Sequence, residues 1–219
     1  MQRSFEIICA AVALILLCPL LAVIALAIKL EDGGPVLYAH PRVGRNFCRF
    51  GLLKFRSMVP RADRMGGPVT VAGDPRITRV GGFLRKYKLD ELPQLINVIK
   101  GEIQLVGARP EFAANVERFR AQYEILLRDR PGITDPATLA YRHEEEMFGT
   151  GDLQEVYFSE ILPRKLELSL LYARERTFRS DLALIFRTIL GICQRSPRVK
   201  KTPKDLPLVM EHRKPGTQA

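Results

Sequence analysis

Asp90 and Glu91 are adjacent acids in a short segment that is otherwise basic and apolar. Three bases precede them: Arg85, Lys86 and Lys88. Apolar residues then recur at helical spacing up to Gly101, so a helix is expected to begin near the acids. Asp90 is expected to be its N-cap, with Pro93 in the first turn, where a missing N–H is tolerated. Free N–H groups and the helix dipole there would keep a carboxylate ionised and attract phosphate. A capped helix with balanced charges accounts for the same residues.

Further bases occur where the pattern predicts strands and turns. Strand alternation places Lys54 and Arg56 on one face and Phe55 on the other. Two such cations could hold a phosphate, and they could equally form a solvated edge. Arg109 is expected in a fixed turn, because a glycine permits the turn before it and a proline can open a helix after it. Arg142 comes after a turn segment rich in proline.

The elements that must position these residues form an α+β pattern. The expected strands are 36–39, 47–55 and 103–106, and the expected amphipathic helices are 92–99, 112–126 and 166–192. A Gly-Arg-Asn turn joins the first two strands as a hairpin. Segment 62–79 is rich in glycine, proline and charge, so a loop able to close over a site is expected. Segment 131–136 is expected to be a turn. The arginine-edged apolar stripe of 166–192 can lie in a membrane interface, although docking on a core is the commoner use.

The composition favours an anionic partner and argues against a zinc site. The 219 residues carry a formal net charge of +10, with a sequence pI of about 9.7. Such a charge is typical of proteins that meet nucleic acid, an acidic membrane surface or phosphorylated substrates. The four cysteines and three histidines show no metal-ligand spacing, so reduced thiols are expected. One ordinary domain with additional segments is the expected organisation.

An almost continuous apolar run extends from Phe5 to Ile28 and is interrupted only by Glu6. About 24 residues, at roughly 1.5 Å per residue, would reach across a bilayer core of about 30 Å. The run is too long for the apolar core of a cleavable signal peptide. Cys18-Pro19 lies in its middle, where the proline removes a helical hydrogen bond and predicts a kink. A membrane segment is therefore predicted.

Two topologies fit this segment. A kinked spanning helix would place the first residues outside the cell, whereas a helix–break–helix hairpin would return to the same face. The basic body after Lys29 indicates a cytoplasmic body. Because spanning helices are commoner, the residues by themselves favour a span. The chain divides into a membrane segment (1–30), a cytosolic domain (31–194) and a basic tail (195–219) that is expected to be disordered.

With these features in order, the sequence resembles the bacterial sugar transferases, and among them the monotopic phosphoglycosyl transferases that load a phosphosugar onto polyprenyl phosphate. The similarity extends from the apolar run to about Arg142 and continues more weakly to Ile192. Its landmarks are Gly34-Pro-Val36, Arg42-Val-Gly-Arg45, Lys54-Phe-Arg-Ser-Met58, Gly73-Asp-Pro-Arg-Ile-Thr-Arg79, Asp90-Glu-Leu-Pro-Gln94, Leu105-Val-Gly107 with Arg109-Pro110, and Pro131-Gly-Ile-Thr134. One such motif would be weak evidence, whereas this many in order are strong evidence.

The resemblance implies an activity and roles for the residues. Asp90 matches the nucleophile, which attacks the β-phosphate of a UDP-sugar, expels UMP and becomes an aspartyl-phosphosugar. Polyprenyl (undecaprenyl) phosphate then takes the phosphosugar. Glu91 is implied to act with bound Mg²⁺, and both acids are placed near that metal. The basic positions implied around the phosphates are Lys54, Arg56, Arg85, Arg109 and Arg142. Carboxylate nucleophiles, cationic cradles and oxygen-ligated magnesium all suit phosphoryl transfer.

The resemblance also implies a fold and a location. The implied α+β fold has an N-terminal re-entrant membrane helix-hairpin, a small cytosolic catalytic domain with a β-hairpin and short strands, and several amphipathic interface helices. Both ends of the proline-broken segment are implied to be cytoplasmic, which reverses the preference for a span. The implied location is the cytoplasmic face of the bacterial inner membrane, at the first membrane step of glycoconjugate or exopolysaccharide assembly. A nucleic-acid partner is not implied, and a homodimer is left open.

The chain departs from the family pattern at a few positions. Cys18 stands where serine usually precedes the proline, and a thiol is the weaker hydrogen-bond donor. Ala108 replaces a proline before Arg109-Pro110, and the segment around Tyr141 is less rich in glycine than usual. We expect the latter changes to affect sugar choice or loop shape rather than reaction type. Two alternatives remain: a membrane-tethered basic scaffold without catalysis, and a degenerate member that binds nucleotide sugar without transferring it.

Overall fold

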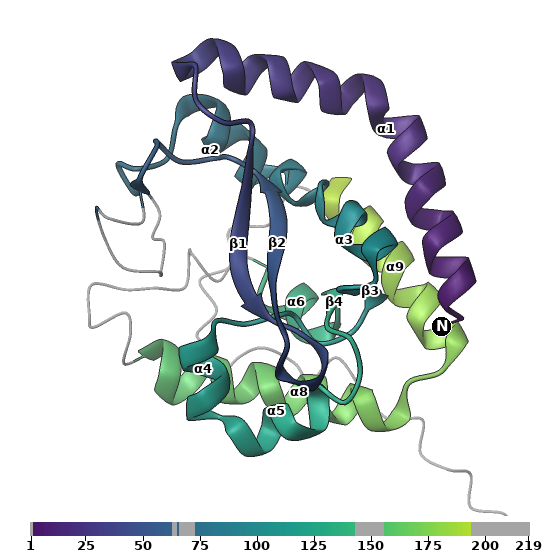
Figure 1. Cartoon of the computed structure of the whole chain (residues 1–219). Coiled ribbons are helices and arrows are strands. Elements are labelled where there is room, and N and C mark those ends of the chain that lie inside the picture. The colour runs from purple at the N-terminus through teal and green to yellow at the C-terminus, as the bar shows by residue number, and fades with distance from the viewer. Residues whose placement is uncertain (1, 63–64, 66–72, 143–155, 194–219) are drawn as a thin grey trace, which may run out of the picture.

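Two small sheets and several short helices lie below one long N-terminal helix that arches over them (Figure 1). The computed structural model describes residues 2–62, 65, 73–142 and 156–193. Its elements, in chain order, are α1 (Arg3–Asp32), β1 (Leu37–Val43), η1 (Arg45–Phe47), β2 (Arg49–Phe55), α2 (Arg79–Lys86), η3 (Leu89–Glu91), α3 (Gln94–Lys100), β3 (Gln104–Val106), α4 (Ala113–Arg118), α5 (Arg120–Leu126), β4 (Gly132–Thr134), α6 (Pro136–Ala140), the π-helical turn η5 (Tyr157–Ile161), α8 (Leu162–Glu175) and α9 (Phe178–Cys193). The predicted mixture of helices and strands is confirmed. Half of the predicted closing loop (63–64 and 66–72) and the whole predicted tail lie outside the described residues.

Helix α1 is continuous through Pro19 and bends near its middle (Figure 1). The missing proline N–H and the crowding of the preceding turn account for such a bend. Because the chain stays helical at Cys18-Pro19, the prediction of two helices separated by a break is wrong in this respect. The helix ends at Gly33, whose φ of 70° is the left-handed conformation that glycine favours.

The middle of α1 exposes apolar side chains, whereas each arm packs on the domain below. Ile15 and Leu16 are 72% and 73% exposed. Both lie in a helix that is long and apolar enough to cross a membrane. In the first arm, Ala10 is buried in a cluster whose other buried members are Leu52, Val98 and Ile103. In the second arm, Ile24 and Ile28 are buried in a cluster with Phe55 and Leu84. The two ends of α1 are thereby fixed to the same body.

Strands β1 and β2 form the predicted antiparallel hairpin, with Leu37 opposite Phe55 and Val43 opposite Arg49. The turn between them includes Asn46 at φ 53°, a left-handed conformation that asparagine tolerates better than most residues. The alternation along β2 is confirmed for Phe55, which packs under the second arm of α1. The hairpin runs from the end of α1 into the body (Figure 1), and Lys54 lies near the end of the hairpin that adjoins α1.

Helix α2 connects the long apolar helix α1 with the acid pair. Its N-cap, Thr78, accepts a hydrogen bond from the N–H of Gly81 at 2.9 Å. A Cβ at Gly81 would lie 2.0 Å from the carbonyl oxygen of Ser57, so this helix can approach the end of β2 only with glycine there. Leu84 packs on α1, and the chain then turns through Lys88, at φ 56°, into η3. Lys88 holds a left-handed conformation that is uncommon for a side chain of its size.

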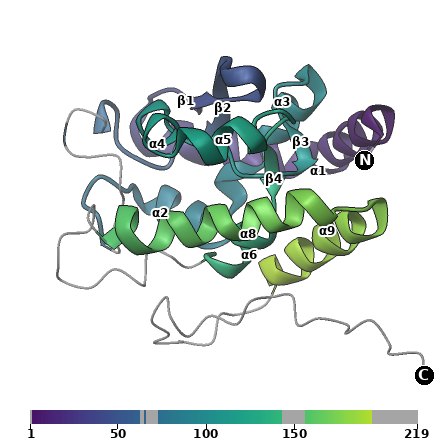
Figure 2. The ribbon, with the colours of Figure 1, turned by 90° about the horizontal axis from the view of Figure 1, so that it is seen from below.

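The remaining helices close the lower side of the body, and they differ from the predicted ones. The predicted helix 112–126 is two helices, because the chain leaves helical geometry at Phe119. The predicted helix 166–192 is likewise α8 and α9, separated at Arg176. The predicted turn 131–136 contains strand β4, which pairs in parallel with β3, and the start of α6. Helix α8 packs against both α5 and α6 (Figure 2).

Candidate active site

Four side chains from three parts of the chain meet at the acid pair. Asp90 and Glu91 lie in η3, Lys54 is near the end of β2, and Arg109 lies in the loop after β3. The ammonium nitrogen of Lys54 is 2.9 Å from Oε1 of Glu91 and 4.0 Å from Oδ2 of Asp90. All four side chains are largely buried. The predicted association of these acids and bases is therefore present in the fold.

Asp90 is a buried acid in a 3-10 turn and not the N-cap that the sequence predicts. Helix α3 begins at Gln94 with Pro93 as its N-cap residue, and that cap lacks a side-chain hydrogen bond. Asp90 is 5% exposed, and its Oδ1 has no hydrogen-bond partner within the part of the chain that the structure describes. Burial raises the pKa of Asp90, and the neighbouring Glu91 charge adds to this, whereas Lys54 opposes it. The helix N-terminus that was expected to keep Asp90 ionised is therefore absent at this residue, and burial instead opposes ionisation.

Glu91 is held by two cations. The guanidinium of Arg109 forms a two-pronged contact with its carboxylate, Nη1 to Oε2 at 3.2 Å and Nη2 to Oε1, and Lys54 donates to Oε1 at 2.9 Å. Burial by itself would raise the pKa of Glu91, but the charges of Arg109 and Lys54 outweigh it and hold this pKa well below its usual range. Glu91 is thus the acid that stays charged, while Asp90 is the one whose protonation is sensitive to its surroundings.

The other predicted phosphate-binding bases do not all reach the acids. Arg85, in the last turn of α2, acts on Asp90 through its charge and lowers the pKa of that acid. Arg56 instead pairs with Asp32 at the end of α1, and it packs so closely on Gly34 that a Cβ there would lie 1.8 Å from Nη1. The guanidinium of Arg142 lies against Gly191 of α9, where an added Cβ would be 2.4 Å from Nη1.

Two basic residues that were not predicted as site residues also belong to this region. Lys88 lowers the pKa values of both acids through its charge, and its place two residues before Asp90 was the available signal. Arg42 pairs with the buried Glu111 at 3.3 Å, and its charge contributes to lowering the pKa of His40. Glu111 immediately follows Arg109-Pro110, so this buried pair anchors the loop that carries Arg109.

A model of one known protein family matches residues 1–195, and its description is "Bacterial sugar transferase". This match covers most of the chain. The chain belongs to the bacterial sugar transferase family. The family and its named relatives are transferases, so the chain is an enzyme of this class. This weighs against the alternative of a basic scaffold without catalysis.

Named relatives of this sugar transferase include proteins of exopolysaccharide and lipid-linked sugar synthesis. The exopolysaccharide production protein ExoY of Sinorhizobium fredii is 33% identical over 207 residues, covering 88% of this chain and 85% of the relative. The undecaprenyl-phosphate glucose phosphotransferase of Komagataeibacter xylinus is 38% identical over 195 residues, covering 86% and 35%. The UDP-glucose:undecaprenyl-phosphate glucose-1-phosphate transferase of Escherichia coli is 37% identical over 194 residues, covering 86% and 39%. The chain thus spans most of ExoY and about a third of the other two.

The carboxylates of Asp90 and Glu91 in this sugar transferase are the oxygen ligands that magnesium prefers, but cations already contact those of Glu91. Magnesium takes oxygen ligands and is commonly held by one or two carboxylates together with substrate phosphates. The unpartnered Oδ1 of Asp90 is such an oxygen. Oε1 of Glu91 accepts from both Lys54 and Arg109, whereas Oε2 accepts one contact from Arg109, so Oε2 is the Glu91 oxygen that could ligate a metal while these pairs stay in place. Among the described residues, the structure brings together no group of three acids, histidines or cysteines that could hold a metal unaided.

Proposed function

We propose that this protein is a phosphoglycosyl transferase that moves a phosphosugar from a UDP-sugar to polyprenyl phosphate on the cytoplasmic face of the inner membrane. The observation that carries the proposal is the buried pair Asp90–Glu91, which lies within a group of cations directly below a membrane helix. The names of the relatives in Komagataeibacter xylinus and Escherichia coli, which specify undecaprenyl phosphate, support the acceptor. ExoY supports a place in exopolysaccharide production.

The reaction proceeds in two displacements at one phosphorus atom. An oxygen of ionised Asp90 bonds to the β-phosphorus of the UDP-sugar, the bond from this phosphorus to the bridging oxygen breaks, and UMP leaves with that oxygen. The sugar phosphate is then an acyl phosphate on Asp90. A phosphate oxygen of polyprenyl phosphate attacks the same phosphorus, the carboxylate of Asp90 leaves, and polyprenyl-diphosphate sugar is formed. A carboxylate nucleophile divides the transfer into two easier steps in this way.

The surrounding side chains supply charge and position. Lys54 lies between both acids and is placed to neutralise a phosphate oxygen while it favours the ionised form of Asp90. Arg109 fixes Glu91 and can exchange part of this contact for phosphate. Magnesium, when bound by Asp90 and Glu91, would neutralise further charge on the transferring phosphate. Arg56 pairs with Asp32, and its Nη1 packs on Gly34, so it supports the end of α1 and could meet an anion only after its side chain moves.

A UDP-sugar panel tests the function. The purified full-length chain in detergent, given magnesium and undecaprenyl phosphate, is expected to release UMP from at least one UDP-sugar and to form a lipid-linked diphosphate sugar. EDTA should abolish both products, because two carboxylates without a metal leave the phosphate charge poorly neutralised. UMP release is followed by a coupled assay and the lipid product by mass spectrometry. Absence of both products across the panel would contradict the proposal.

The proposed topology is a re-entrant α1 whose two ends both face the cytoplasm. Arg3 donates to the carbonyl oxygens of Val98 and Ile99, so the first turn of α1 lies on α3. Lys29, in the last turn, leads through Gly33 directly into the hairpin. A straight helix would separate Arg3 and Lys29 by about 40 Å and place them on opposite sides of a bilayer. A bent helix that enters the membrane and returns lets a domain on one side hold both of its ends.

Cysteine labelling tests this topology. In a variant lacking the native thiols, Gln2→Cys is expected to react with a membrane-impermeant maleimide only after the inner membrane is opened. Glu117→Cys is the matched cytoplasmic control, because its side chain is 70% exposed on α4. Both positions should give the same pattern. Labelling of Gln2→Cys, but not of Glu117→Cys, in cells whose outer membrane alone is permeabilised would establish a spanning helix.

The pH dependence of the first displacement should depend on Lys54. Asp90 must be ionised to attack, and its pKa is raised by burial, so kcat/KM for the UDP-sugar should fall with decreasing pH at values above the ordinary aspartate range. Lys54 lowers the pKa of Asp90. Lys54→Met should therefore move this acidic limb to higher pH, besides lowering the maximum rate. If kcat/KM of Lys54→Met falls over the same pH range as that of wild type, the fall does not result from protonation of Asp90.

A further inference from the structure

Three aromatic side chains form a row beside the acid site that the proposed chemistry does not use. The ring centroids of Tyr38 and His40 are 5.5 Å apart, and those of His40 and Phe112 are 4.7 Å apart. Beyond them, the guanidinium carbon of Arg42 lies 3.6 Å from the centroid of Phe112. We call Tyr38, His40 and Phe112 the aromatic row. Tyr38, at its open end, is 43% exposed, although it lies in a strand of the body.

The aromatic row borders the phosphate-binding cations. Tyr38 is directly opposite Lys54 in the hairpin, and residues opposite one another in an antiparallel pair share a face of the sheet. His40 lies two positions along from Tyr38 on that same face. Burial lowers the pKa of His40 to about 3, and the charges of Arg42, Lys54 and Arg109 contribute to this shift. Two of the cations that contact Glu91 therefore act on the imidazole as well.

The chemistry of the row suits a flat heteroaromatic ring. Aromatic side chains offer faces on which bases stack, and this stacking does not depend on base sequence. The neutral imidazole of His40 has one N–H donor and one nitrogen acceptor, which can meet a ring edge that carries both kinds of group. The row is also held in place, since Arg42 covers Phe112 and is itself paired with the buried Glu111. Such a surface needs little ordering when a ligand binds.

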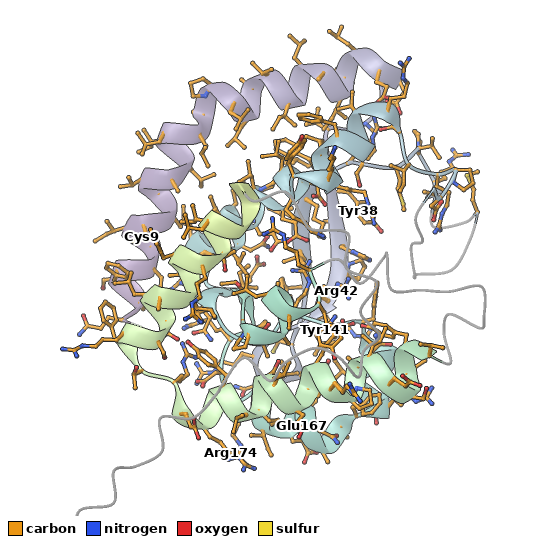
Figure 3. All side chains as sticks on the ribbon, turned by 180° about the vertical axis from the view of Figure 1, so that it is seen from behind. Cys9, Tyr38, Arg42, Tyr141, Glu167 and Arg174 are labelled. Carbon is orange, nitrogen blue, oxygen red and sulfur yellow. The ribbon has the colours of Figure 1, made fainter. Side chains whose placement is uncertain are left out.

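We propose that the aromatic row is the platform on which the base of the nucleotide donor stacks, with Tyr38 as its exposed face. This inference rests on the proposed function, because it assumes a nucleotide-sugar donor whose β-phosphorus is at Asp90. The base is separated from that phosphorus by the ribose and one more phosphate. The row follows β1 away from the end of α1, from Tyr38 toward Arg42 (Figures 1 and 3).

Binding of UMP and of inorganic diphosphate to the full-length chain tests the platform. Tyr38→Leu keeps apolar bulk but removes the aromatic face, and we expect it to weaken UMP binding about tenfold. Tyr38→Phe keeps the ring and should bind UMP within about twofold of wild type. Inhibition by inorganic diphosphate, which has no base, should be unchanged in both variants. Phe186→Leu, which alters an exposed aromatic ring on α9, is the matched control and should bind UMP as wild type does.

The two proposals fail separately. If wild type releases UMP from a UDP-sugar but Tyr38→Leu binds UMP as tightly as wild type, the platform is wrong and the proposed function stands. Equal weakening of UMP and diphosphate by Tyr38→Leu would also overturn the platform, because it would indicate damage to the Lys54 site. If wild type transfers no sugar but its UMP affinity depends on the Tyr38 ring as stated, the platform stands and the proposed function is wrong.

Discussion

Asp90→Asn should lower the rate of UMP release from a UDP-sugar by roughly four to six orders of magnitude, because an amide cannot form the acyl phosphate through which we propose the transfer to proceed. Asparagine has the shape of aspartate, and burial already disfavours the charged form of Asp90, so the variant is expected to fold and to remain in the membrane. Initial rates of UMP release, together with membrane fractionation, measure both expectations. UDP-sugar binding should survive, because Lys54, Glu91 and Arg109 remain in contact.

Two further variants, Asp32→Asn and Glu91→Gln, serve as controls for Asp90→Asn. Asp32→Asn changes an acid that pairs with Arg56 at the end of α1, away from the contacts of the acid pair, and should retain the covalent step. Glu91→Gln should slow turnover but leave the phosphosugar on residue 90 when the acceptor lipid is withheld. Peptide mapping of this trapped species identifies the side chain. UMP release by Asp90→Asn at the wild-type rate, or a sugar phosphate bonded to Glu91, would remove Asp90 from the mechanism.

Arg109→Leu is expected to cost about 100- to 1,000-fold in kcat/KM for the UDP-sugar, which is typical for loss of a preorganised charge at a reacting phosphate. The physical reason is specific to this site. Arg109 is the largest charge that lowers the pKa of Glu91, so without it the buried carboxylate loses its two-pronged partner and ionises less readily. Magnesium affinity should fall with it. Steady-state kinetics over a range of magnesium concentrations measure both effects.

The matched variants separate charge from geometry. Arg109→Lys retains a cation but cannot reproduce the two parallel contacts with Glu91, so it should recover only part of the rate. Arg120→Leu removes an arginine from two exposed ion pairs on the outer side of α5, and it should behave as wild type. Wild-type kinetics for Arg109→Leu would mean that the Arg109–Glu91 contact only holds the loop after β3 in place.

Several elements could be predicted because their signals are local. The hairpin follows from apolar runs around a Gly-Arg-Asn turn. Its register then places Lys54 near the C-terminal end of α1. The membrane helix follows from an apolar run, and its bend from the proline within it. The parallel pairing of β3 with β4 was missed, because each strand has three residues and their pairing joins segments about 28 positions apart, from Gln104 to Gly132. No periodicity can accumulate over such short strands.

The positions of the bases were the least predictable part of the site. Lys54 and Arg56 share a strand face by alternation, yet one contacts Glu91 and the other contacts Asp32. The strand ends at Phe55, so alternation no longer governs the residue that follows it. Similarly, Arg142 matches a family position but lies against Gly191, which belongs to a helix about 50 residues later in the chain. Long side chains choose partners by proximity in space, which spacing along the chain does not reveal.

The sequence by itself determined which groups this sugar transferase has available: an adjacent acid pair, the bases near it, an apolar segment interrupted by proline, and the ordered motifs of its family. The tertiary structure alone decided that Asp90 is buried in a 3-10 turn, that Arg109 and Lys54 share Glu91, and that both arms of α1 pack on one body. The physical reason is that residue type and periodicity act over a few neighbours. Burial, and with it the pKa of an acid, depends on whatever distant segments pack around it.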